Sequence, residues 1–360
     1  MKKILGLTMG IIAAVGDCSG QTAVSKTAGE VYKNVVVLRD TPQSEWTATM
    51  SFMSGSLGVT CSYCHAQQYD SDAKAAKVTA RAMIRMVHQI NATNFGGKQV
   101  VTCNTCHQGA THPNGVPGLW NKTPEQLAAF KAASAPKAAA KVSESLPSAD
   151  QILDQYRKAV GSDQVKSVHV VGTLSSDLTP ARSFEGYAVF PDRLVITLSL
   201  SGAQNKMLIN GDRVWGISPA GASELSSTQA IQVRKSMMDL FQPLKFINVN
   251  DRHEVVGSET VGGRKCFVVQ ASGDSHVDRM YFDSQTGLLA KFRNERHTAL
   301  GVEPSELVLD DYRELGGVKV PFSVTIYSLT DRVLYRLSEF GVNAAVDEGM
   351  FAVPAVSGGK

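Results

Sequence analysis

The spacing of hydrophobic positions changes along the chain, from helical in the first third to strand-like from about residue 165 onward. A first helix is predicted to begin at Thr41, a good N-cap that is followed by proline, and to be stopped by Gly55. Trp46, Met50 and Met53 then share one face of that helix. The early part of the chain is therefore expected to be mainly α-helical.

A second helix is predicted to begin at Asp72 and to end between Asn91 and Gly97. A strand-like segment, residues 99–101, follows it. The apolar side chains of this helix recur along one side, at Ala76, Ala80, Met83, Val87 and Ile90.

Short runs of alternating apolar and polar residues occupy the rest of the chain, after a helix that begins at Ser148. Asn210-Gly211-Asp212 between two such runs is a hairpin signal, and a further helix is predicted at residues 228–240. Regular strand spacing with turn residues predicts an antiparallel sheet or open barrel. The runs are residues 168–173, 184–190, 194–198, 206–210, 213–217, 253–256, 265–270, 279–282, 288–292, 306–312, 324–328 and 333–340.

The helical part also carries the chemistry, in two copies of the motif C-x-x-C-H. Cys61, Cys64 and His65 form the first copy, and the second comprises Cys103, Cys106 and His107 (sequence Cys-Asn-Thr-Cys-His). This motif is the attachment signature of c-type haem. Two thiols at this spacing can each add to one vinyl group of a porphyrin, and the adjacent histidine then ligates the iron. The sequence thus predicts two covalently bound haem c groups.

Two other uses of these cysteines are a structural zinc site and a pair of local disulfides. A zinc site would combine both cysteine pairs, but 38 residues (65–102) separate Cys64 from Cys103, against about 15–20 in a zinc ribbon. Zinc also does not require a histidine directly after both pairs. The spacing favours haem.

The predicted organisation is a signal peptide at residues 1–20, a dihaem domain at 21–120, a linker at 121–147 and a β domain at 148–360. Lys2 and Lys3 precede an apolar run that is too short to span a bilayer, which is typical of an export signal. An uncut membrane anchor is the alternative. Cys18 stands where a lipoprotein cysteine could, although Asp17 before it fits lipid processing poorly. We expect a periplasmic or exported protein, with membrane association open.

Composition narrows the functional classes. A net charge of +3 over 360 residues is too small to indicate nucleic-acid binding, and 43% hydrophobic residues are enough to build cores. No Ser/His/Asp arrangement, phosphate loop or carboxylate pair stands out in the second half, so no catalytic residue is assigned. Cys266, in a valine-rich run, is expected to be a buried and inert thiol.

Each attachment motif follows a helix that bears methionines. The simplest interpretation is that each helix lies along one haem and offers a thioether as the second axial ligand. Histidine and methionine together leave no open iron position, which indicates electron transfer. Spacing alone does not separate Met50 from Met53, or Met83 from Met86. His88 and His112 are weaker candidates for iron ligands, and Arg81 and Arg85 are candidate partners for the haem propionates.

The segments around the motifs resemble the multihaem cytochrome subunit of photosynthetic reaction centres. They are residues 33–38, Glu45-Trp46-Thr47-Ala48-Thr49-Met50, Ala80-Arg81-Ala82-Met83 and residues 101–109, within about 30–115. The resemblance implies Met50 and Met83 as the axial methionines, with Met53 left open by a slightly short loop. That subunit typically carries four haems and this chain has two motifs, so service to a reaction centre does not follow.

The second half resembles the outer-membrane lipoprotein-sorting and lipoprotein-carrier family. The matching segments are residues 280–289, 309–313, 317–322 and 351–354. The resemblance implies a curved sheet that wraps a helix and can hold acyl chains on its concave face. A helix that simply completes the core is the alternative.

Three functions remain to be distinguished. The leading hypothesis is an exported dihaem cytochrome that passes electrons between redox partners, with a β domain for docking or for binding a hydrophobic ligand or membrane surface. A dihaem peroxidase would need one open iron. A lipid or lipoprotein carrier with a haem redox module would place the function in the β domain.

Overall fold

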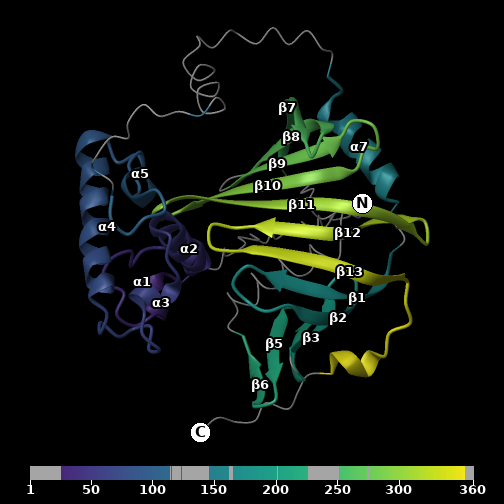
Figure 1. Ribbon diagram of the computed structural model, residues 1–360, viewed down its shortest axis with the longest axis horizontal. Coiled ribbons are helices and arrows are strands. Elements are labelled where there is room, and N and C mark those ends of the chain that lie inside the picture. Colours follow the sequence, from purple (N-terminus) through teal and green to yellow (C-terminus); the bar gives the residue numbers. More distant parts are fainter. Residues whose placement is uncertain are drawn as a thin grey trace, which may run out of the picture.

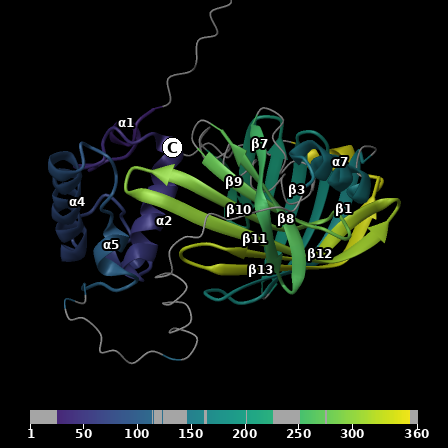
Figure 2. The ribbon, with the colours of Figure 1, turned by 90° about the horizontal axis from the view of Figure 1, so that it is seen from above.

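The computed structural model describes residues 26–113, 115, 123, 146–161, 165–200, 202–225, 251–273 and 276–352. In these ranges the chain forms a helical region followed by one open antiparallel sheet, as expected for the fold class. The helical region lies beside one end of the strands, with helix α2 (Trp46–Leu57) next to the sheet (Figure 1). The view from above shows α1, α2, α4 and α5 of this region at the same end of the sheet (Figure 2).

The helical region consists of two longer helices and several single turns. Each C-x-x-C motif forms one of the single turns, and each of these turns follows one of the two longer helices in the chain. The elements are α1 (Ala28–Val31), the 3-10 turn η1 (Gln43–Glu45), α2, α3 (Cys61–Cys64), α4 (Ala75–Asn94) and α5 (Cys103–His107).

Helix α2 ends three residues later than predicted. Gly58, not Gly55, adopts the left-handed conformation (φ 64°) that terminates a helix. The amide of Val59 donates to the carbonyl of Ser54 (3.1 Å), as in a Schellman motif. Gly55 lies inside the helix because Leu329 packs on it; a Cβ there would be 2.6 Å from the Leu329 Cβ.

The second predicted helix is present as α4, but it begins at Ala75 rather than at Asp72. Asp72 does not cap the helix, because its carboxylate is bound to Arg81, nine residues further along (2.9 Å). The strand predicted at residues 99–101 is absent. The amides of Val100 and Val101 instead donate to the side chain of Asn91 (3.2 and 2.9 Å).

The sheet has 13 strands in the described residues, in the order β6-β5-β4-β3-β2-β1-β13-β12-β11-β10-β9-β8-β7. Every described pairing is antiparallel. Strands that are adjacent in the sheet are also consecutive in the chain, except β1 and β13, and the consecutive strands β6 and β7 form the two edges. The strands are β1 (Ser167–Ser176), β2 (Arg182–Val189), β3 (Arg193–Leu200), β4 (Ala203–Asn210), β5 (Arg213–Ser218), β6 (Gly221–Glu224), β7 (Arg252–Val261), β8 (Arg264–Ser272), β9 (His276–Asp283), β10 (Leu289–Thr298), β11 (Gly301–Leu315), β12 (Val318–Tyr327) and β13 (Arg332–Val342).

All twelve predicted strands are present, and β6 is an additional short edge strand. The predicted hairpin connects β4 and β5, with Gly211 at φ 62° between them. Cys266 on β8 is fully buried, as predicted. Strands with alternating polarity were recognisable because each buries one face of a shared sheet.

One helix packs on the sheet and completes its larger core. Helix α7 (Ala149–Val160) begins at Ser148, whose hydroxyl accepts from the Gln151 amide (3.2 Å). Its apolar stripe enters a cluster with strands β8 to β12, and Figure 1 shows it beside β7 to β10. The helix residues of the cluster are Ile152, Leu153, Tyr156 and Val160.

A small hydrophobic cluster joins the helical region to the sheet. Phe52 of α2, Ile84 of α4 and Leu300 of the β10–β11 turn are each no more than 6% exposed and pack together. Leu329 of the β12–β13 turn and Cys103 lie against this cluster. Residues far apart in the chain therefore hold the second C-x-x-C motif against the sheet.

Several predicted features lie outside the described residues: the signal peptide at 1–20 with Cys18, most of the linker at 121–147, and the helix at 228–240. In the part that the structure describes, no helix combines the length and the apolar character that a membrane crossing needs.

Candidate functional site

The first C-x-x-C-H motif lines a cavity of about 670 Å³. This volume falls within the range of about 300–1,000 Å³ for ligand and cofactor sites. Helix α2, the turn α3, the start of α4 and residues 31–38 form its walls. Its chemical groups are Met50, Met53, Cys61, Cys64 and His65, with Trp46, Leu57 and Ile84 among the apolar residues. The cavity thus unites two thiols, an imidazole and thioethers, the set that a c-type haem requires.

His65 is oriented by its backbone surroundings. Its Nδ1 lies 3.0 Å from the carbonyl of Tyr69, and the Tyr69 ring stacks on the imidazole at 4.8 Å between centroids. A ring nitrogen that donates to a carbonyl leaves the other nitrogen as the electron-pair donor. Nε2 is then the nitrogen available to a metal in the cavity.

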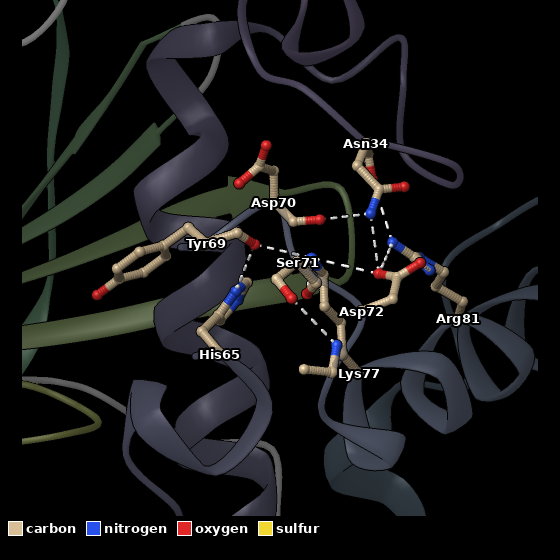
Figure 3. A network of polar contacts seen from close by, with 9 residues as sticks. Asn34, His65, Tyr69, Asp70, Ser71, Asp72, Lys77 and Arg81 are labelled. Atoms are coloured by element: carbon tan, nitrogen blue, oxygen red, sulfur yellow. Dashed lines mark hydrogen bonds and ion pairs between the residues drawn. The ribbon is translucent and has the colours of Figure 1, made fainter. Parts of the chain in front are cut away.

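A polar network fixes the loop that carries this carbonyl (Figure 3). Asp72 binds Arg81 through both oxygens (2.9 Å each) and accepts from Asn34 Nδ2 (2.9 Å). Lys77 Nζ donates to the carbonyl of Tyr69 (2.7 Å) and lies 3.5 Å from the Asp72 carboxylate. The hydrogen bond from Arg81 is the main cause that lowers the pKa of Asp72 to about 2.

This network gives a testable pH dependence. The pKa of Asp72 lies below its ordinary value of 3.8, so its contribution to stability is complete above about pH 4 and is lost as the pH falls to about 2. Asp72→Asn should therefore lower stability at pH 6, and the difference from wild type should vanish near pH 2. Urea unfolding at a series of pH values measures it.

Asp70→Asn is the matched control, because the Asp70 carboxylate has no hydrogen bond or ion pair within the described ranges. It removes the same charge from the same loop. A pH-independent difference for Asp72→Asn, or equal effects of both variants, would contradict the assignment.

The second motif is built in the same way on a more open surface. Thr102 and Thr105 form a capping box at the start of α5, with the Thr102 amide donating to Thr105 Oγ1 (3.0 Å). His107 Nδ1 lies 2.9 Å from the carbonyl of Ala110, which repeats the arrangement of the first histidine. Cys103 is half-buried, Cys106 is exposed, and burial raises the pKa of the Cys103 thiol.

The two motifs are joined directly through the backbone. The amide of Gly109, just after the second motif, donates to the carbonyl of Ser56 at the end of α2 (2.9 Å). Gly58 permits this approach, since a Cβ at its position would be 2.1 Å from the Gly109 carbonyl oxygen. In addition, α5 packs against α2 and α3 packs against α4. The two sites therefore form one structural unit.

The geometry does not support the zinc or disulfide alternatives. Across the described ranges, no three His, Cys, Asp or Glu side chains are close enough to hold one metal ion. The five cysteines that the structure describes are all free thiols. The two cysteine pairs are therefore not gathered around one metal ion in this part of the chain.

The candidate methionines lie in different surroundings. Met50 and Met53 both line the first cavity, and Met53 also packs against the cluster of Phe52, Ile84 and Leu300. Met83 and Met86 are 38% and 43% exposed on α4. His88 and His112 are exposed, and neither lines the first cavity. Arg81 lines the cavity, but its guanidinium is paired with Asp72.

Sequence reasoning missed the supporting groups Tyr69, Asp72 and Lys77, and it did not place α4 in the wall of the first cavity. The sequence did contain a signal for this ion-pair network. Lys77 and Arg81 are four residues apart, so they share one helix face, and they follow Asp72 closely in the chain. The side chains that orient a ligand carry no motif of their own, so only their assembly in space reveals them.

Comparison with known proteins supports the motif assignment. Residues 13–178 match a family described as the photosynthetic reaction centre cytochrome C subunit. This part of the chain resembles that cytochrome subunit.

Two curated relatives are similar to the same part. Cytochrome c-554 of Chloroflexus aurantiacus is 35% identical over 108 residues, which cover 28% of this chain and 25% of the relative. The photosynthetic reaction center cytochrome c subunit of Rubrivivax gelatinosus is 33% identical over 107 residues, which cover 29% of this chain and 28% of the relative. The chain thus spans about a quarter of the length of the cytochromes it matches.

The solved structures that match are similar to the β part. A LolA superfamily protein from Nitrosomonas europaea matches with a TM-score of 0.41 and 11% identity, covering 58% of this chain and 99% of that protein.

Proposed function

We propose that this protein is an exported dihaem c-type cytochrome that transfers electrons between redox partners. One observation carries the proposal: a single cavity of about 670 Å³ is lined by both thiols and the histidine of the first motif and by Met50. The resemblance to reaction-centre cytochrome subunits supports it for this half of the chain. One-electron transfer is the chemistry that haem c supplies when it has histidine and methionine as its axial ligands.

In the first site, Cys61 and Cys64 would hold the porphyrin and His65 and Met50 the iron. Met50 is preferred to Met53 because Met53 already packs against the cluster that joins the helical region to the sheet. A side chain committed to that packing is less free to point at a metal. Trp46 and Leu57 would exclude water from the ring.

In the second site, Cys103, Cys106 and His107 have the corresponding roles, and Met83 is preferred to Met86. The buried stripe of α4 consists of Ile84, Val87 and Asn91. At 3.6 residues per turn, Met83 lies about 75° from the centre of this stripe and Met86 about 135°. Met83 is also on the flank opposite Arg81, which lines the first cavity. One helix would thereby serve two haems on its two sides.

The histidine and methionine ligation proposed for both sites would leave no open iron, and a peroxidase needs one. For the β domain we propose docking of a redox partner, or binding of a lipid-like ligand or membrane surface. The export signal that the sequence predicts at residues 1–20, and the chemistry of haem attachment outside the cytoplasm, support a periplasmic location.

The test is to purify the full chain from a host that matures c-type cytochromes. Protein mass and a pyridine haemochrome assay should give two haems per chain, and both should be low-spin and unreactive with carbon monoxide. A colourless protein, or one that contains zinc, would overturn the proposal. A carbon-monoxide-reactive haem with peroxide turnover would favour the peroxidase, and a co-purifying lipid found by mass spectrometry would favour the carrier.

A further inference from the structure

The carbonyl that orients His65 also receives a cation. The Tyr69 oxygen lies 3.0 Å from His65 Nδ1 and accepts from Lys77 Nζ at 2.7 Å (Figure 3). Lys77 donates a further hydrogen bond to the Ser71 carbonyl (3.0 Å), and its side chain is only 12% exposed. The ammonium group is therefore held at this oxygen rather than moving freely in solvent.

Within the described residues, the second site has the same histidine anchor but no cation on its carbonyl. His107 Nδ1 lies 2.9 Å from the Ala110 carbonyl. No lysine or arginine within the described ranges donates a hydrogen bond to that oxygen. In the described residues, the two histidine anchors thus differ by one charged contact on the carbonyl.

This contact acts on the iron ligand in a definite direction. A hydrogen bond from Nδ1 to an acceptor makes the opposite ring nitrogen a stronger donor to a metal. A cation on the same acceptor draws electron density away from that hydrogen bond, so the imidazole becomes a weaker donor. The positive charge also disfavours oxidation, which adds positive charge at the metal. Both effects favour the reduced state.

The surrounding charges leave this effect in place. Asp72 faces Lys77 at 3.5 Å, but its two oxygens also bind Arg81. One carboxylate is therefore shared between two cations. Lys74, the next cation on this side, donates to the Ser62 carbonyl (2.7 Å) instead.

We propose that Lys77 is a positioning residue that raises the reduction potential of the first haem relative to the second, acting through the Tyr69 carbonyl and His65. The inference rests on the proposed function, because it requires haem at Cys61 and Cys64. It makes the first haem the site that holds an electron more firmly.

The experiment is a spectroelectrochemical titration of the full exported chain carrying Lys77→Met. One of the two midpoint potentials should fall and the other should stay, so the gap between them narrows. Lys77→Arg, which keeps the charge, should restore most of the wild-type value. Lys77→Gln keeps a hydrogen-bond donor without the charge, so its midpoint potential should lie between those of Lys77→Met and wild type. It replaces Lys77→Met if that variant does not fold.

Lys74→Met is the matched control, because it removes the same charge three residues earlier, at the N-cap of α4, without touching the Tyr69 carbonyl. Its potentials should move clearly less than those of Lys77→Met, because Lys74 contacts the Ser62 carbonyl and not the carbonyl that orients His65. In the NMR spectrum of the reduced protein, the Nδ1 proton of His65 should move in Lys77→Met and not in the control.

Unchanged potentials in Lys77→Met, or equal shifts in both lysine variants, would overturn the inference while leaving the proposed function intact. Haem content, measured on the same samples, distinguishes a failure of this inference from a failure of the proposed function. A wild-type chain without haem at Cys61 and Cys64 would overturn both.

Discussion

Replacing Met50 with alanine should convert half of the haem iron to a high-spin form that binds carbon monoxide. The side chain lines the first cavity together with His65, and its removal leaves that iron without a sixth ligand. The affected haem should also lose reduction potential, because the thioether favours the reduced state. Optical spectra of the reduced protein with and without carbon monoxide measure the fraction converted.

Met53→Ala is the control for this result. It removes the same side chain from the same cavity wall and should leave both haems low-spin. Met53→Ala should instead lower the free energy of unfolding by about 2 kcal/mol, because Met53 packs against the cluster around Phe52. If Met53→Ala opens the haem and Met50→Ala does not, the ligand assignment is reversed.

Gly58→Ala should be the most destabilising single methyl addition in the helical region, at about 2–4 kcal/mol, from left-handed strain together with overpacking. The residue has φ 64°, and the new Cβ would stand 2.1 Å from the carbonyl oxygen of Gly109. That oxygen belongs to backbone and cannot swing away as a side chain would. Chemical denaturation followed by circular dichroism measures the loss.

Gly96→Ala separates the two causes. Gly96 has nearly the same backbone angle (φ 59°), but nothing lies within 4 Å of a Cβ there. It should cost only about 1 kcal/mol, the strain of a left-handed alanine. The additional loss of unfolding free energy in Gly58→Ala should be accompanied by altered spectra of the second haem, because Gly109 follows His107 closely. Equal losses in the two variants would mean that the close approach is unimportant.

The elements of this fold were predictable where one residue pattern decides the structure. Alternating polarity predicted twelve strands, and the apolar stripe that includes Ile152 and Tyr156 predicted α7, because burial of one face is a local property of the sequence. The C-x-x-C-H motifs likewise predicted the thiols and histidine that the structure gathers around the first cavity.

Features that depend on distant partners were not predictable. Gly55 was expected to end α2, but Leu329, more than 270 residues away in the chain, packs on it and explains its presence inside the helix. Asp72 was expected to start α4, but it binds Arg81 instead. In both cases a side-chain contact outweighed a local preference. The Leu329 contact leaves no local pattern, whereas the spacing of Lys77 and Arg81 after Asp72 offered a local signal.

The strand order has a consequence for how the chain reaches its final form. Strands β1 to β6 and strands β7 to β13 are two up-and-down meanders, joined by a single seam where Val168 pairs with Val342. Neighbours within a meander meet quickly, whereas the seam must wait until almost the whole polypeptide has been synthesised. A chain cut before residue 332 would leave β1 as an exposed edge in the middle of the intended sheet. The two C-x-x-C-H motifs, by contrast, are complete by residue 107, long before the strands of the seam have been synthesised.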